Sequence, residues 1–143
     1  MKCVSLMLLI VSMTRCQSEE DLNCICSVMI IGDDQIFVRY TNPMMKQHVD
    51  DCTNVDSCKQ KCDQAMNKWT ENGNLNATPF GSNYTVGDIG CQMLGIDVDL
   101  GIGKVFASLC GDTSAKTDFK FQSNFCCRNW HHRDNCARKS KDE

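Results

Sequence analysis

The first pattern of apolar and polar positions along the chain is strand-like. Residues 23–31 and 35–41 are rich in β-branched and aromatic side chains, which favour an extended backbone. Residues 32–34 between them, Gly-Asp-Asp, are typical of a short turn. The two stretches therefore predict a β-hairpin.

The spacing of apolar residues becomes helical from Asp56 onward. Asp56 or Ser57 can cap the start of a helix, and Gly73 can end it. The apolar side chains recur at i, i+4, i+7, i+8 and i+11, at Cys58, Cys62, Ala65, Met66 and Trp69. This stripe predicts an amphipathic helix that carries Trp69 into the core.

Two further helices are expected in the second half of the chain. A short one spans about Asp88 to Leu94, with Thr85 as its cap. A longer one runs from about Asp99 to Cys110, although Gly101 and Gly103 weaken its start. Its apolar residues would share one face, namely Ile102, Val105, Phe106, Leu109 and Cys110.

A late strand completes the predicted architecture. Phe119, Phe121 and Phe125 alternate with polar residues, and this period of two could add a strand to the hairpin. From Arg128 the chain is expected to form a cross-linked tail. The predicted fold is a single α+β domain, in which the hairpin and the late strand are covered by two or three helices and stapled by disulfides.

The N-terminus has the layout of a secretory signal peptide. Lys2 forms a short positive region, residues 6–11 form an apolar stretch, and residues 14–18 are polar. Residues 1–16 are therefore expected to be removed, by a cut after residue 16 or 18. The remaining residues, 17–143, are predicted to be one secreted, extracellular domain. No apolar run reaches the roughly 18 residues that a membrane span needs.

Composition and charge exclude two classes of protein. The chain has 143 residues, of which 42% are hydrophobic and 23% charged, so whole-chain disorder is not expected. The formal net charge of -3 argues against a nucleic-acid-binding protein. Residues 17–118 carry 7 basic and 15 acidic groups, whereas residues 119–143 carry 6 and 3. The predicted domain therefore has an acidic body and a basic C-terminal tail.

The cysteine content predicts a disulfide scaffold. The chain has 12 cysteines, and removal of the leader takes Cys3 and Cys16 with it. An even number then remains in an oxidising compartment. The disulfide candidates are Cys24, Cys26, Cys52, Cys58, Cys62, Cys91, Cys110, Cys126, Cys127 and Cys136. Five bridges would make the fold fail under reduction.

Four of these cysteines have matching spacings. Cys24 and Cys26 point to one face of the predicted strand, about 6.6 Å apart. Cys58 and Cys62 lie one turn apart on the predicted helix, with a rise of about 6 Å. A helix on the sheet could therefore form two parallel disulfides, in either order. The arrangement resembles the cysteine-stabilised αβ motif of defensins and scorpion toxins, used here as a geometric analogy.

The segment from Cys126 to Cys136 contains the most distinctive group of reactive residues. Cys126 and Cys127 are adjacent, so in an extended chain they would point to opposite sides and bind different partners. The segment also holds His131, His132 and Asp134. It resembles the active-site helix of secreted phospholipases A2, in which calcium polarises the substrate and a His–Asp pair activates water. The resemblance implies a helix here and a hydrolase activity, and it covers 11 residues.

Metal and cofactor chemistry is not predicted. A zinc site of cysteine and histidine ligands is not expected, since disulfides consume the thiols. The stretch 97–99, Asp-Val-Asp, begins like a calcium loop, but Ser108 stands where such a loop needs a glutamate. We therefore expect no metal and no cofactor.

The sequence favours a binding role over catalysis. Asn76 and Asn83 begin two N-glycosylation sequons, which suit an exposed loop of a glycoprotein. The tail offers an aromatic residue flanked by cations, a pattern typical of interfaces, formed by Arg128, Trp130, His131, His132 and Arg133.

We expect a secreted, non-catalytic binding or structural protein whose ligand is an extracellular protein, matrix or glycan. The main alternative is a toxin-like or antimicrobial effector that acts on membranes or channels through peripheral contact. A degenerate phospholipase A2-like hydrolase is the third hypothesis.

Overall fold

The computed structural model describes residues 22–32, 36–111 and 113–134. The predicted leader, both cut positions and Cys136 lie outside the described residues. The strands are β1 (Asn23–Ile31), β2 (Ile36–His48), β3 (Val98–Leu109), β4 (Thr113–Lys116), β5 (Phe125–Arg128) and β6 (His131–His132). The helices are α1 (Val55–Trp69) and α2 (Val86–Leu94).

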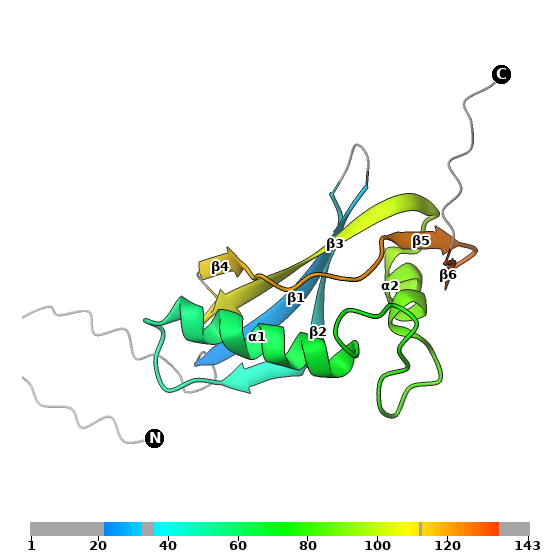
Figure 1. Cartoon of the computed structure of the whole chain (residues 1–143). Coiled ribbons are helices and arrows are strands. Elements are labelled where there is room, and N and C mark those ends of the chain that lie inside the picture. Colours follow the sequence, from blue (N-terminus) through cyan, green and yellow to red (C-terminus); the bar gives the residue numbers. More distant parts are fainter. Residues whose placement is uncertain (1–21, 33–35, 112, 135–143) are drawn as a thin grey trace, which may run out of the picture.

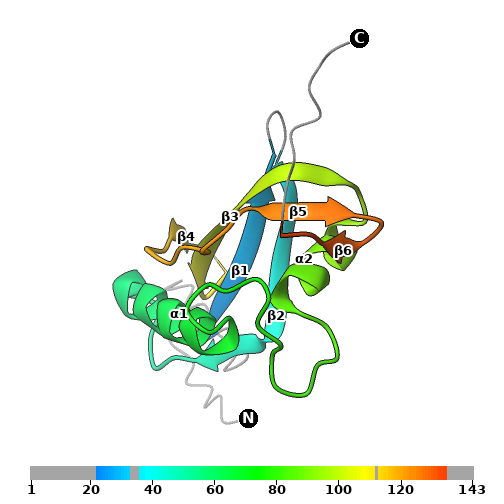
Figure 2. The ribbon, with the colours of Figure 1, turned by 45° about the vertical axis from the view of Figure 1, so that its right-hand side comes forward.

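An antiparallel sheet with the strand order β2-β1-β3-β5-β6 forms the body of the domain, and β4 pairs with β3 beside this path. The strand β3 is long and curled, so that one end reaches β4 and the other reaches β5 (Figure 1). The two helices lie at different ends of the sheet, α1 along β1 and β3 and α2 beside β5 and β6 (Figure 2). The α+β class and the hairpin are confirmed.

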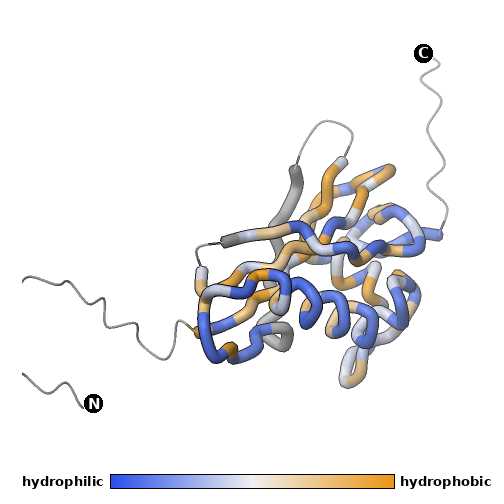
Figure 3. Tube along the Cα trace, turned by 60° about the vertical axis from the view of Figure 1, so that its left-hand side comes forward, coloured by the Kyte–Doolittle hydropathy of each residue, from blue (hydrophilic) through white to orange (hydrophobic). Residues whose placement is uncertain are grey.

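The core lies between the helices and one face of the sheet. Val28 and Ile30 of β1 point to this face and are almost fully buried, as is Met66 of α1. In Figure 3 the trace of β1 is mostly hydrophobic, whereas α1 carries many hydrophilic residues on its outer side. Trp69 is partly buried and packs against the core, in agreement with the prediction.

The ends of both helices follow their sequence signals. Asn54 caps α1 by accepting a hydrogen bond from the Ser57 backbone N–H at 2.9 Å, so the cap lies two residues before the predicted Asp56. Thr85 caps α2 as expected, through a hydrogen bond from the Asp88 N–H to Thr85 Oγ1 at 3.0 Å.

The prediction of a third helix from Asp99 to Cys110 is wrong. This stretch is β3, and Val105 pairs with Val28 of β1. Val105, Ala107 and Leu109 are buried at every second position, as on one face of a strand, and Ser108 between them is buried as well. A Cβ on Gly103 would lie 2.5 Å from the Phe121 ring. The glycines of β3 therefore leave room for side chains such as the Phe121 ring to pack closely on the strand. The apolar residues of this stretch fit a helical as well as a strand period.

The predicted late strand is also misplaced. The strand β5 starts only at Phe125, and it pairs with β3, not with the hairpin. Phe119 and Phe121 lie outside any strand. The three rings nevertheless pack together edge to face, with centroids 5.1 Å apart in each neighbouring pair. The alternation thus marks core-facing residues of a mostly irregular segment.

The two parallel disulfides are confirmed, and their order is now fixed. Cys24 bonds to Cys58 and Cys26 to Cys62, with Cα–Cα distances of 5.6 and 5.4 Å. All four residues are at most 1% exposed. The bridges fasten the first two turns of α1 to β1.

Two more disulfides are described. Cys52 bonds to Cys110 and Cys91 to Cys127. Cys126 is also a disulfide cysteine, so the adjacent pair has different partners, as predicted.

Candidate functional site

The segment that follows β5 forms a tight hairpin. Arg128 of β5 pairs with His131 of β6, and only Asn129 and Trp130 connect them. Both connecting residues have positive φ, 50° and 69°, as in a type I′ turn. The active-site helix implied by the resemblance to phospholipases A2 is therefore contradicted, because these residues form strands and a turn. The expected tail is an ordered hairpin as far as Asp134.

Trp130 stands at the tip of this hairpin. Its side chain is 63% exposed, although tryptophan is usually highly buried. A positive φ is a strained conformation for a bulky residue, since glycine is the usual occupant of this turn position. Strained residues persist only where the surroundings fix them, and they gather at functional sites.

Contacts from the β3 side hold the turn in place. The Arg128 guanidinium forms ion pairs with Asp97, at 3.8 Å, and with Asp99. The backbone N–H of Asn129 donates to Asp97 Oδ1 at 2.9 Å. The Cys91–Cys127 disulfide ties β5 to α2. The start of β3 and helix α2 thus brace the hairpin from two sides.

The two histidines have different roles in this arrangement. His132 packs onto α2 so closely that a Cβ on Gly87 would lie 2.4 Å from its ring. Its Nδ1 accepts a hydrogen bond from the Cys126 N–H at 3.4 Å. Burial lowers the pKa of the His132 imidazole below its ordinary 6.5, although the Asp134 and Asp88 carboxylates favour the charged form. His132 is therefore a neutral packing residue.

His131 lies on the outside of the same contact. Its Nδ1 is 3.4 Å from Asp88 Oδ1, and its side chain is 55% exposed. The same Asp88 oxygen accepts the His132 backbone N–H at 2.9 Å. Burial raises the pKa of Asp88, but hydrogen bonds from His132, Thr85 and His131 outweigh it, so the pKa lies below the ordinary 3.8. Asp88 thus stays ionised and anchors β6.

The surroundings of Trp130 are not as cationic as the sequence suggests. Arg128 is neutralised by its two aspartates, and His131 lies against Asp88. Arg133 is exposed and forms no ion pair among the described residues. The carboxylates on or against the hairpin outnumber the arginines, with Asp88, Asp97, Asp99 and Asp134 against Arg128 and Arg133.

Sequence reasoning identified the residues of the hairpin but missed its braces. From the sequence, Asp97 and Asp99 resemble the start of a calcium loop, Asp99 also begins a predicted helix, and Asp88 is predicted only as a helix residue. Their contacts with residues 129 and 132 join positions that are 32 and 44 residues apart in the sequence. The sequence offers one signal for these contacts, namely that Asp97 and Asp99 are close together and opposite in charge to Arg128.

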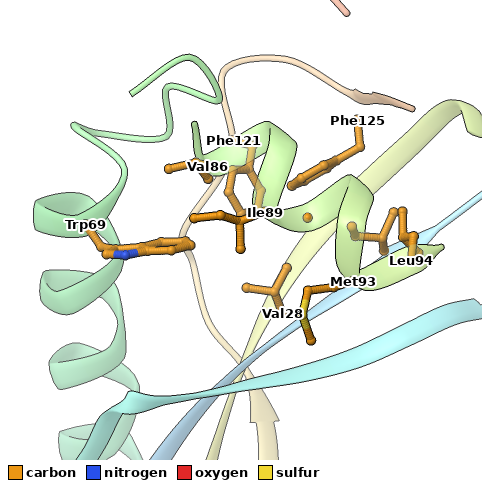
Figure 4. Close-up of a pocket in the computed structure, with 10 residues that line it drawn as sticks. Val28, Trp69, Val86, Ile89, Met93, Leu94, Phe121 and Phe125 are labelled. Carbon is orange, nitrogen blue, oxygen red and sulfur yellow. The ribbon is translucent and has the colours of Figure 1, made fainter. Parts of the chain in front are cut away.

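An apolar cavity lies behind the hairpin, between the two helices and the sheet. In Figure 4, Trp69 of α1 faces Ile89 of α2 across it, and Phe125 closes one side. Its volume of about 20 Å³ is close to that of a single water probe. This space is a packing gap and is too small for a ligand.

A wider groove lies on the other side of Trp69. Its volume is about 810 Å³, within the range of ligand sites. One wall is the outer face of α1. The other is the part of the loop between α1 and α2 that includes Phe80, whose side chain is fully exposed. The lining residues include Lys61, Gln64, Lys68, Thr78 and Pro79.

No free metal-binding group is found among the residues that the structure describes. Within that part of the chain, the only group of three or more potential metal ligands is Cys24, Cys26 and Cys62, whose sulfur atoms lie within 4.8 Å of one another. All three sulfurs are in disulfides, so none of them is a thiolate that could bind a metal.

The other predicted residues are placed as follows. Asn76 and Asn83 are both exposed, on the loop between α1 and α2. No helix in the described part of the chain is long and apolar enough to cross a membrane. Comparisons of the chain with protein-family models, with curated proteins and with solved structures find no match.

Proposed function

We propose that this chain is a secreted, non-catalytic binding protein that contacts an extracellular protein partner through Trp130. One observation carries the proposal, namely a solvent-exposed tryptophan held in a strained turn by contacts from two other elements. Exposed aromatic anchors dominate the energetics of many protein interfaces. A braced turn also loses little conformational entropy on binding.

The disulfides support the extracellular part of the proposal. Four described bridges in a domain of this size are typical of proteins that work in oxidising surroundings. They also stabilise a small core against unfolding outside the cell.

The charge around the hairpin favours a protein partner over a membrane. Membrane-active segments attach through an excess of lysine and arginine. Here Arg128 is paired with Asp97 and Asp99, and Asp88 and Asp134 add further negative charge. Anionic lipid would be repelled by these carboxylates, whereas a protein surface can meet Trp130 with an apolar pocket.

A binding assay with matched variants tests the proposal. Labelled protein is titrated onto intact cells and deposited matrix of the producing species, before and after protease treatment of the surface. We expect saturable binding that protease removes. Trp130→Ala should weaken it by roughly 30-fold or more, the effect of an anchor residue worth about 2 kcal/mol.

Tyr84→Ala is the matched control, because it removes another exposed aromatic side chain from a different loop, outside the groove lined by α1 and Phe80. It should leave the binding unchanged. Equal binding by the wild type and Trp130→Ala would contradict the proposal. Leakage of anionic vesicles that depends on Trp130 would instead establish the membrane-active alternative.

A further inference from the structure

Phe80 is fully exposed, at 104% of its reference area, yet it is held in a defined turn. The Ser82 N–H donates to the Pro79 carbonyl oxygen at 2.9 Å, and Gly81 has a φ of 80°. These are the marks of a type II turn with Phe80 at its first corner. A fully exposed aromatic side chain on an ordered turn is typical of a site where another group covers the ring.

Asn83 follows on the same loop and begins the sequon Asn83-Tyr84-Thr85. Its side chain is exposed and forms no hydrogen bond with any described residue. The backbone on either side is fixed, since Ser82 Oγ accepts from the Tyr84 N–H at 3.0 Å and Thr85 caps α2. The Asn83 amide is therefore presented outward from an ordered loop.

The other sequon is less suited to carry a sugar. Asn76 uses its Nδ2 to donate to Asp134 Oδ1 at 2.7 Å, so the nitrogen that a sugar would occupy already contacts the hairpin. The following residue, Ala77, is only 4% exposed. Pro79 directly follows this sequon. Pro79 disfavours transfer to Asn76 in the unfolded chain, and a sugar on Asn76 would also cost the folded chain its contact with Asp134.

We propose that Asn83 carries an N-linked glycan and that the first sugar of this glycan lies on the ring of Phe80. The group that covers the exposed Phe80 ring is then a sugar attached to the same chain. The inference rests on the secretory route in the proposed function, but not on binding through Trp130.

The chemistry of attachment is a group transfer. Asn83 Nδ2 attacks C1 of the sugar in a lipid-pyrophosphate-linked oligosaccharide. The C1–N bond forms while the bond from C1 to the pyrophosphate oxygen breaks, and the lipid pyrophosphate leaves. Nδ2 keeps one N–H, and the proton that it loses goes to the departing lipid pyrophosphate through the surrounding water. Transfer to the unfolded chain does not conflict with the later use of Thr85 as a helix cap.

The turn places the ring and the amide close enough for contact. Phe80 and Asn83 are only three residues apart on this ordered loop, so their Cα atoms lie at most about 11 Å from each other, a span that a phenyl side chain and a sugar on Asn83 can bridge. A pyranose ring offers a face of C–H groups, which the negative face of an aromatic ring attracts. Because the turn already fixes the backbone of Phe80, only its side-chain torsions remain to be ordered by the contact.

The test is a double-mutant cycle on protein secreted from eukaryotic cells. Peptide mass spectrometry first measures occupancy at each sequon, and we expect a glycan at Asn83 and none at Asn76. The cycle then compares Tm for the wild type, Asn83→Gln, Phe80→Ala and the double variant. We expect Asn83→Gln to lower Tm by a few degrees in the wild-type background and by clearly less in the Phe80→Ala background.

The matched control is Trp130→Ala, whose effect on Tm should not depend on the glycan. Secreted protein that is unmodified at Asn83 would overturn the proposal while leaving secretion intact. So would a Tm loss from Asn83→Gln that is equal with and without the Phe80→Ala substitution. A chain that is retained inside the cell and unglycosylated would overturn both the proposal and the secretory route.

Discussion

The two disulfides between β1 and α1 close almost the same loop, so their contributions to stability should not be additive. Cys24–Cys58 and Cys26–Cys62 span sequence separations of 34 and 36. In the chain-entropy description, one such bridge raises the free energy of the unfolded chain by about 3.8 kcal/mol at 25 °C. The second bridge then closes only a ring of about 8 residues, which adds about 2.5 kcal/mol.

The predicted free energies of unfolding follow from this difference. Removal of either bridge alone leaves the other to close the large loop, so it should cost about 2.5 kcal/mol. Removal of both should cost about 6 kcal/mol, which exceeds the two single losses together by about 1 kcal/mol. Each single loss also includes the missing buried sulfurs, a contribution that largely cancels in a double-mutant cycle.

Urea unfolding without reductant measures the effect, using Cys→Ala pairs and the fourfold variant. The control cycle combines Cys24–Cys58 with Cys91–Cys127, whose loop of sequence separation 36 does not overlap the first. That pair should be additive within about 0.5 kcal/mol. Additive losses for the two parallel bridges, or a single loss as large as the full value of about 3.8 kcal/mol, would refute the shared-loop reasoning.

Three further predictions concern the hairpin and its support. Trp130→Gly should be more stable than Trp130→Ala by about 1 kcal/mol in urea unfolding, because only glycine adopts a positive φ without strain; a more stable alanine variant would argue against the type I′ turn. Because the folded pKa of His132 lies below 6.5, the unfolded chain binds more protons, so stability should fall as pH drops below about 6.5. His132→Asn should flatten this part of a stability–pH profile, and an unchanged profile would contradict the assignment. Gly87→Ala should destabilise the fold by about 1–3 kcal/mol despite better helix propensity, since its Cβ would lie 2.4 Å from the His132 ring; faster amide exchange in residues 125–132 would locate the damage.

Features set by local spacing were predictable from the sequence. The α1 stripe and the disulfides of Cys24 and Cys26 depend on periods of 3.6 or 2 within short segments, and the Thr85 cap depends on a hydrogen bond to the backbone three residues on. These periods also decide which side chains face one another when a helix lies on a strand. The parallel bridges followed from that geometry without knowledge of the rest of the fold.

The sequence predictions were wrong where the local pattern fits two kinds of element, or where contacts between residues far apart in the sequence decide the structure. The stretch of β3 fits a helical stripe as well as a strand, and its pairing with β1 decided between them. The turn at Asn129 and Trp130 lacks the glycine that usually marks a hairpin. It forms because Asp97 and Asp88, from other segments, hold its two strands.

The disulfides stabilise the domain by more than the strained turn at Trp130 destabilises it. A positive φ at Trp130 costs on the order of 1–3 kcal/mol. The two bridges between β1 and α1 together contribute about 6 kcal/mol, so the strain is smaller than their stabilisation. If Trp130 had no role in binding, glycine at position 130 would lower the free energy of the folded state with no loss of function. The exposed tryptophan at a backbone position that favours glycine is therefore the feature on which the proposed binding role rests.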